Sequence, residues 1–244
     1  MKQILVLILG AFSLVSCQFN ETLVLNEDGT GRMSLSMDLS EMMAFGGEMS
    51  QDSTFTKQDT IVSLKEIFEE KKDSISKLSK AEQKRLKAIE NYKIHMVSDP
   101  DENKLIVDVF SDFKDVSEAN NLMQGFEQTE SLLPGNKSAG ADDDSPESEL
   151  LGVSYTFKKG VFKRDAFIKD EERHKSQLDS LKQAESFMSS MKYKIKYTFP
   201  RRIKKASAED ATYSLDGKTI ELERNFLDYF KNPDVLDLEV ELEN

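Results

Sequence analysis

The chain has 244 residues and carries 45 Asp and Glu against 33 Lys and Arg, so its formal net charge is −12. This acidity argues against nucleic acid as a partner, because phosphates require a basic face, and against broad binding to anionic lipid head groups. Cys17 is the only cysteine, so no intramolecular disulfide is available and packing must stabilise the fold.

Residues 1–16 predict a cleavable lipoprotein signal peptide. Lys2 is followed by an apolar run over residues 4–15, which is shorter than the roughly 20 residues that a membrane-spanning helix needs. The run ends in Leu14-Val15-Ser16-Cys17, which resembles the lipobox of bacterial lipoproteins. The resemblance implies cleavage before Cys17 and lipidation of its thiol. The alternative is a free thiol inside an ordinary signal that is removed.

The residues after Cys17 bear on where such a lipoprotein would be sorted. Gln18 takes the place of the aspartate that keeps many lipoproteins on the inner membrane, which favours the outer membrane. Glu21 is a lone acid and matches surface-export signals poorly, so the periplasmic face is expected. Two or three acyl chains on Cys17 would hold the protein on this membrane durably. Residues 18–20 are expected to form a short tether.

Residues 17–128 are expected to form an N-terminal α+β region. Period-two alternation over Glu21–Ser40 predicts a hairpin that turns at Asp28-Gly29. A short helix containing Met42 and Met43 and a polar loop to Thr60 should follow.

Two helices and a second hairpin are predicted next. Apolar residues at three- and four-residue spacing over Ile61–Leu78 indicate an amphipathic helix. Ser79 and Glu82 form the capping-box pattern that starts another helix. Residues 92–110 alternate around a turn at 99–101, and a short helix is expected over 119–126.

Residues 129–149 are rich in Gly, Ser, Pro and acid, and they predict a flexible linker or loop. Residues 150–244 are expected to form a C-terminal α+β region. Its predicted elements are a hairpin over Leu150–Phe167, a helix over Asp170–Met191, a strand over Tyr193–Phe199, a hairpin over Tyr213–Leu222 that turns at Asp216-Gly217, a helical turn over Asn225–Lys231 and a last strand over Leu236–Leu242.

Hairpins alternate with helices along the whole chain. Antiparallel hairpins with helices between them bury one sheet face against the helices. The predicted fold class is therefore α+β, with an antiparallel sheet built from successive hairpins and helices packed largely on one face. Whether residues 129–149 divide two lobes or decorate one sheet is left open by the sequence.

The sequence offers no catalytic, cofactor-binding or metal-binding residues by motif. His95 and His174 lack the partners at set spacing that a zinc or catalytic site requires, and both are expected to be ordinary surface or sheet histidines. The acids Asp142, Asp143 and Asp144 lack the EF-hand spacing and are expected to be solvated. Gly29-Thr30-Gly31 lies in a hairpin turn and does not precede a helix, as a phosphate loop would.

One basic cluster stands out in the acidic chain. It comprises Arg201, Arg202, Lys204 and Lys205, and four charges are the low end for recognition of lipid phosphates. The favoured interpretation is an exposed strand end or turn whose charges resist edge pairing.

The stretch from Cys17 to Gly31, an anchor cysteine followed by a hairpin with a D-G turn, resembles a family of LppM-like envelope lipoproteins. The resemblance is limited to the start of the mature chain and implies lipid binding at the cell envelope. The first hypothesis is therefore a non-enzymatic, membrane-anchored protein that binds a lipid or apolar ligand. The alternatives are a structural or assembly lipoprotein that acts through protein partners, and an envelope hydrolase that uses carboxylates.

Overall fold

The computed structural model describes residues 18–40, 56–122, 150–182 and 185–244. The signal peptide, the lipobox with Cys17, the expected helix at Met42 and Met43, and the linker over 129–149 lie outside these described residues.

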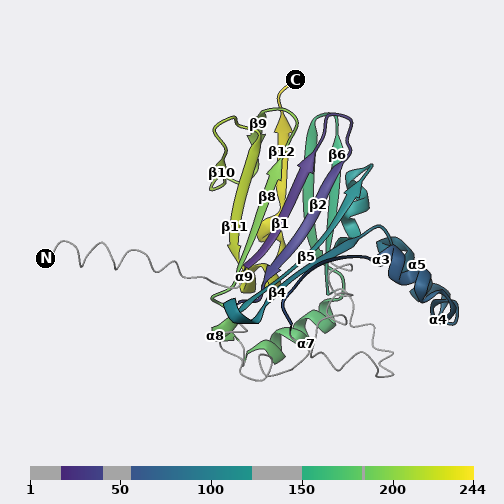
Figure 1. Cartoon of the computed structure of the whole chain (residues 1–244). Coiled ribbons are helices and arrows are strands. Elements are labelled where there is room, and N and C mark those ends of the chain that lie inside the picture. The colour runs from purple at the N-terminus through teal and green to yellow at the C-terminus, as the bar shows by residue number, and fades with distance from the viewer. Residues whose placement is uncertain (1–17, 41–55, 123–149, 183–184) are drawn as a thin grey trace, which may run out of the picture.

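The described residues form two β-sheets with short helices around them (Figure 1). The larger sheet has eight strands in the order β10-β11-β8-β1-β2-β5-β4-β3, and the smaller has four in the order β6-β7-β12-β9. The strands of the large sheet are β1 (Gln18–Leu25), β2 (Gly31–Asp38), β3 (Gln58–Ser63), β4 (Lys93–Asp99), β5 (Lys104–Phe113), β8 (Lys192–Thr198), β10 (Thr212–Tyr213) and β11 (Thr219–Asn225). Those of the small sheet are β6 (Leu151–Lys158), β7 (Val161–Ile168), β9 (Ile203–Ala206) and β12 (Leu238–Leu242).

The helices are short. The α-helices are α3 (Leu64–Glu70), α4 (Lys72–Ile75), α5 (Lys80–Ile89), α7 (Glu171–Leu181), α8 (Glu185–Met188) and α9 (Phe226–Lys231). The 3-10 helices are η1 (Pro100–Glu102), η2 (Val116–Asn121) and η3 (Pro233–Leu236). In Figure 1, α7 and α8 lie beyond the lower ends of the strands, and α3 to α5 extend outward at the β3 side of the large sheet.

The α+β class and the construction from hairpins are confirmed. The hairpins β1–β2, β4–β5, β6–β7 and β10–β11 lie where the alternation predicts them. Gly29 turns the first of them with a φ of 84°, a left-handed conformation that glycine adopts without strain. The capping box at Ser79 and Glu82 is also confirmed, because the Ser79 hydroxyl accepts from the Glu82 N–H and the Glu82 carboxylate accepts from the Ser79 N–H.

The second sheet is the main addition to this picture. The inner face of the large sheet packs against the small sheet, where the Phe162 ring of β7 lies 5.3 Å from the rings of both Tyr197 and Phe199. Leu23, Met33 and Val109 of the large sheet are completely buried in this interface. Alternation shows which residues of a strand face a core, but it does not show whether a helix or another sheet covers them.

One strand pair departs from the antiparallel expectation. β1 and β8 are parallel neighbours, with Glu21 level with Ile195. A parallel pair requires a long connection, and the chain between these two strands supplies one. As a result, the regions 17–128 and 150–244 contribute strands to the same large sheet.

Two local predictions are corrected. The helix expected from Ile61 begins only at Leu64, because Gln58–Ser63 pairs along its length with β4 as strand β3. The β-branched run Thr60-Ile61-Val62 favours this extended backbone. The tether expected at residues 18–20 is also absent, since these residues already belong to β1 and pair with both β2 and β8.

Two helix predictions are met in part. The helix expected over 170–191 is represented by α7 and α8, between which residues 183–184 are outside the described part. Of the helix expected over 119–126, the described portion is mainly the 3-10 helix η2.

Candidate functional site

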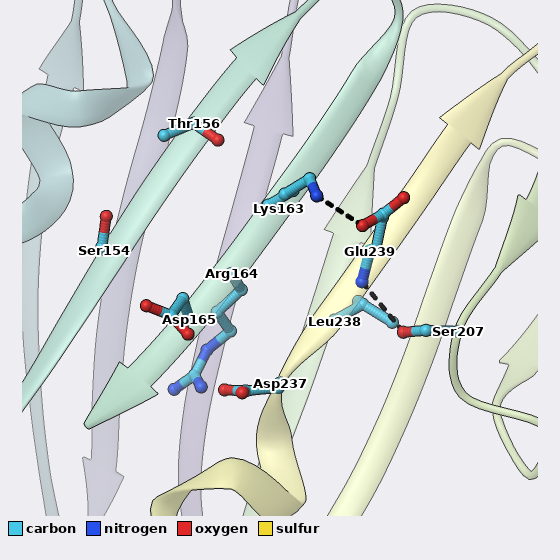
Figure 2. A pocket seen from close by; sticks show the side chains of 9 residues that line it. All are labelled: Ser154, Thr156, Lys163, Arg164, Asp165, Ser207, Asp237, Leu238 and Glu239. Carbon is cyan, nitrogen blue, oxygen red and sulfur yellow. Dashed lines mark hydrogen bonds and ion pairs between the residues drawn. The ribbon is translucent and has the colours of Figure 1, made fainter. Parts of the chain in front are cut away.

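An open pocket of about 410 Å³ lies on the face of the small sheet that points away from the large sheet (Figure 2). Three strands and the residue after β9 supply its lining. The lining residues are Ser154 and Thr156 of β6, Lys163, Arg164 and Asp165 of β7, Asp237, Leu238 and Glu239 at β12, and Ser207. The volume falls in the range of small-molecule sites, about 300–1,000 Å³.

The pairing of the strands brings these side chains together. Asp165 lies opposite Ser154, and Lys163 lies opposite both Thr156 and Glu239. Residues directly opposite in an antiparallel pair project from the same face, which creates one continuous polar surface. The inward neighbours Phe162 and Ala166 are buried, so the same alternation assigns Lys163 and Asp165 to the pocket side.

One side of the pocket is internally neutralised. The Lys163 ammonium lies 2.6 Å from the Glu239 carboxylate (Figure 2). The Ser207 hydroxyl accepts a hydrogen bond from the Glu239 N–H at 2.9 Å, and the Ser207 N–H donates to the Glu239 carbonyl at 2.9 Å. The ion pair balances the Lys163 and Glu239 charges on this side, and the Ser207 contacts fix the Glu239 backbone.

The other side carries two carboxylates without a counter-charge. Asp165 and Asp237 form no ion pair with any residue in the described ranges. Asp237 accepts a hydrogen bond from the Ala166 N–H at 2.8 Å. Partial burial and the negative charges of Asp165 and Asp234 raise the pKa of Asp237, and the Ala166 N–H and the Arg164 charge oppose this only in part. The pocket therefore has an uncompensated negative charge at Asp165 and Asp237.

Beneath the pocket, Arg164 connects its floor to a buried polar network. The Arg164 guanidinium donates to both carboxylate oxygens of Glu21, at 3.2 Å from Nε and 3.0 Å from Nη2. The hydroxyls of Tyr155, Tyr193 and Tyr197 donate to the same carboxylate. Glu21 and Arg164 are only 1% and 2% exposed, so this network is closed to solvent and to a substrate.

Electrostatics keeps both members of this ion pair charged. Burial alone would raise the pKa of Glu21, but the Arg164 charge and the hydrogen bonds from Arg164, Tyr193 and Tyr197 hold it below its ordinary value. Burial and the Glu21 charge raise the pKa of Tyr155 and Tyr197 well above the usual tyrosine range, so both hydroxyls stay protonated as donors. The network joins β1 and β8 of the large sheet to β6 and β7 of the small sheet.

Neither of the histidines singled out in the sequence is among the residues that line the pocket. His95 on β4 is partly exposed, and its Nε2 lies 2.7 Å from Asp59 of β3. His174 corrects the expectation of a surface histidine, because it is only 4% exposed and its Nε2 donates to the Phe230 carbonyl at 2.6 Å. The helix α7 packs its His174 face against α9, which the charged neighbours of His174 in the sequence did not reveal.

The basic cluster lies at the edge strand β9 and just before it, as the favoured interpretation predicts. Lys204 forms an ion pair with Glu241 at 2.5 Å, and Arg201 lies 3.4 Å from Glu27. Arg202 and Lys205 are exposed. Partial neutralisation by neighbouring acids argues that this cluster mainly keeps the edge soluble.

Sequence reasoning missed both the pocket and the network, although one signal was present. Glu21 lies at the same strand parity as Phe19 and Leu23, which predicts a carboxylate on the buried face. A buried carboxylate needs a partner of opposite charge. Arg164 alternates in phase with the apolar residues Phe162 and Ala166, which predicts that its side chain also points to a buried face. No such signal marks Asp165 and Asp237, because acids are frequent throughout this chain.

The described residues thus define an α+β protein made of two packed sheets, with a polar pocket on the small sheet. No protein-family profile matches the sequence, and no curated protein is significantly similar to it. Among solved structures, the chain is similar to the folded domain of LppM from Mycobacterium tuberculosis, determined by NMR, with 7% identity and a TM-score of 0.41 over 93% of this chain and 89% of that one. A likeness at this level says nothing about what the present chain binds. None of the described helices is long and apolar enough to cross a membrane.

Proposed function

We propose that this chain is a lipid-anchored, non-enzymatic binding protein of the bacterial outer membrane, facing the periplasm, and that its pocket holds a ligand with a positively charged amine. The observation that carries the ligand assignment is the pair of uncompensated carboxylates, Asp165 and Asp237, in an open pocket.

The anchor part of the proposal rests on the lipobox and gains a geometric consequence from the fold. Strand β1 begins at Gln18, the residue directly after Cys17. Acyl chains on Cys17 would therefore be joined to the first residue of the central strand of the large sheet. This arrangement would hold the β1 start of the sandwich against the bilayer without a tether.

The chemistry of the pocket suits an ammonium group. An ammonium has three donors and no acceptor, and a carboxylate pair provides acceptors and the opposite charge. The hydroxyls of Ser154 and Thr156 line the same space and could bind hydroxyls or a phosphate ester near the amine. Burial, together with the charges of Asp165 and Asp234, raises the pKa of Asp237. A cation binds the ionised carboxylate, so affinity should increase as the pH rises through this pKa.

The amine could come from a lipid head group or from a free amino compound. Leu238 is the one apolar side chain among the residues that line this pocket, so the pocket fits a polar head better than an acyl chain. The hypothesis of a purely apolar ligand stays a prediction that this pocket does not support.

Calorimetric titration tests the ligand assignment. Phosphoethanolamine and glucosamine serve as soluble amines, N-acetylglucosamine serves as the matched neutral compound, and vesicles with or without phosphatidylethanolamine represent the lipid source. We expect the amines to bind and the neutral compound to fail. Asp165→Asn and Asp237→Asn should each abolish binding, while Glu223→Gln, an exposed acid on the other sheet, should not. Equal binding of glucosamine and N-acetylglucosamine would refute the assignment.

Intact-mass measurement tests the anchor. A mature chain that begins at Cys17 with added acyl mass is expected, and Cys17→Ser should release the protein from the membrane fraction. A mature chain that begins at Cys17 without acyl mass would show that the lipobox is only the end of an ordinary signal.

The hydrolase alternative has one observation in its favour. Two carboxylates share a pocket, and Asp237 has a raised pKa, which is the property of a general acid. A glycosidase and esterase screen separates the two proposals. Turnover that Asp237→Asn removes would establish an enzyme in place of a binding protein.

A further inference from the structure

The two sheets have four edge strands, and three of them are blunted. An edge strand exposes unpaired N–H and C=O groups that can pair with another chain. β10 has only two residues. β9 has four residues, including Lys204 and Lys205, and its pairing with β12 shifts register. The edge strand β6 is bound by η2, where the Asn120 side chain accepts from the Tyr155 N–H at 2.8 Å.

The fourth edge strand, β3, lacks these protections within the described residues. All six residues of Gln58–Ser63 pair with β4, and none of the described strands pairs with the other side of β3. The strand contains no lysine and no proline, and its Thr60-Ile61-Val62 run has high β-propensity. The Ile61 side chain is 59% exposed.

Two charged side chains lie on or beside β3, and both contact groups on its neighbour β4. Asp59 lies 2.7 Å from His95, and Lys57 forms an ion pair with Asp99 at 2.5 Å. Asp59 and Lys57 are still 77% and 74% exposed, so a second strand must place uncharged residues opposite them. The open side of β3 presents backbone groups together with Ile61.

We infer that β3 is a self-association edge, at which a second copy of this chain pairs antiparallel about a two-fold axis through Ile61. A two-fold axis perpendicular to the sheet keeps each residue on its own face, so opposite residues must have the same parity. Centred on Ile61, the pairing sets Ile61 against Ile61 of the second copy, Thr60 against Val62, and Asp59 against Ser63. No like charges are opposed. A centre at Thr60 would set Asp59 against the exposed Ile61, which is less favourable.

The twist of the sheet makes this pairing compatible with two anchors on one bilayer, a point that rests on the proposed lipidation. Neighbouring strands rotate by about 20–25°, and four steps lead from β1 through β2, β5 and β4 to β3, so β3 runs roughly 80–100° from β1. Figure 1 shows the strands fanning out from β1 in this direction. If β1 stands upright on the membrane, the sheet at β3 is turned roughly parallel to the membrane surface. The two-fold axis, which is perpendicular to the sheet at β3, then lies near the membrane normal. Both copies then keep their β1 starts on the same side.

The strand pair has additional surface beside it. Five residue pairs alone bury little area, and isolated two-stranded contacts are marginal in water. The arm α3 to α5 follows β3 directly and extends outward at the same side of the molecule (Figure 1). Leu78, in the turn between α4 and α5, is 39% exposed and is available for contact with the second copy.

Disulfide trapping tests the register, in membranes for the lipidated chain and in solution for the chain without the anchor. Ile61→Cys is introduced into the full chain, in which acylated Cys17 offers no thiol, and in parallel into the Cys17→Ser chain, so the result does not depend on lipidation. Opposed residues at the axis have Cβ atoms about 4.5–5.5 Å apart, close enough to cross-link under mild oxidation. Asp59→Cys lies on the same face but would be about 13 Å from its counterpart, and it serves as the matched control.

We expect a covalent dimer from Ile61→Cys, at least tenfold more than from Asp59→Cys. Ile61→Lys should convert the protein to a monomer in light scattering, while Leu215→Lys, another exposed apolar residue, should leave the dimer intact. Equal trapping of the two cysteine variants, a cross-linked product of any other mass, or a monomeric parent chain would overturn the inference. Loss of acylation or of amine binding would refute the proposed function and leave this result unchanged.

Discussion

Replacing Glu21 with glutamine should be the most damaging conservative change in this protein. The substitution preserves the shape of the side chain but removes the one carboxylate among the described residues that forms an ion pair with the buried Arg164 guanidinium. Removing one partner of a buried ion pair costs about 3–5 kcal/mol, because it leaves an uncompensated charge. The glutamine amide would also place a donor against tyrosine hydroxyls that now donate to the carboxylate.

This cost is large compared with the stability of a typical domain, about 5–15 kcal/mol. For a protein of this size it corresponds to a decrease in Tm of roughly 6–20 °C. Urea unfolding monitored by tyrosine fluorescence and circular dichroism measures the effect. The chain has no tryptophan and six tyrosines, and Tyr155, Tyr193, Tyr197 and Tyr229 surround Glu21 and Arg164, so the fluorescence reports on the network itself.

Two further variants identify the cause. Adding Arg164→Met to Glu21→Gln should recover part of the lost stability, because no unpaired charge then remains in the interior. Glu223→Gln, at an exposed position on β11, should change the free energy of unfolding by less than about 0.5 kcal/mol. The reasoning would be refuted if Glu21→Gln unfolded within about 1 kcal/mol of wild type, or if the double variant were less stable than the single one.

Three other predictions concern pH, backbone space and the pocket. The folded protein lowers the pKa of Glu21, so the Glu21 carboxylate contributes fully to stability above the ordinary glutamate pKa, about pH 4. This contribution is lost as the pH falls through the lowered pKa of the folded state. Acid unfolding of Glu21→Gln should lack this component. Gly31→Ala should destabilise the protein by about 2 kcal/mol or more in urea unfolding, because an added Cβ would meet the Phe113 ring at 2.6 Å and the Val24 carbonyl. A Cβ at Gly29 would meet no atom within 4 Å, so Gly29→Ala should cost only about 1 kcal/mol, for the positive φ. Asp237→Asn should abolish amine binding without lowering the Tm, because asparagine can still accept from the Ala166 N–H and no longer repels the neighbouring acids.

The sequence by itself determined the local elements and the position of the hairpin turns. Period-two alternation identifies strands such as β4, β5 and β12, and Asp28-Gly29 and Asp216-Gly217 mark turns, because both signals depend on residues that are neighbours in the chain. The capping box at Ser79 is local in the same way. The lipobox at Cys17 is also a local pattern, and its lipidation stays a prediction.

Pairing between distant segments was decided only by the tertiary structure. The helical spacing predicted from Ile61 is interrupted at its start, because pairing with β4 selects a strand over Gln58–Ser63 and the helix begins only at Leu64. The parallel contact of β1 with β8 and the second sheet that covers the core follow from long-range packing, which alternation does not encode. The pocket carboxylates Asp165 and Asp237 are 72 positions apart in the numbering and meet because β7 pairs with β12. Glu21 and Arg164 are 143 residues apart, and only the packing of two sheets removes both from water and joins their charges.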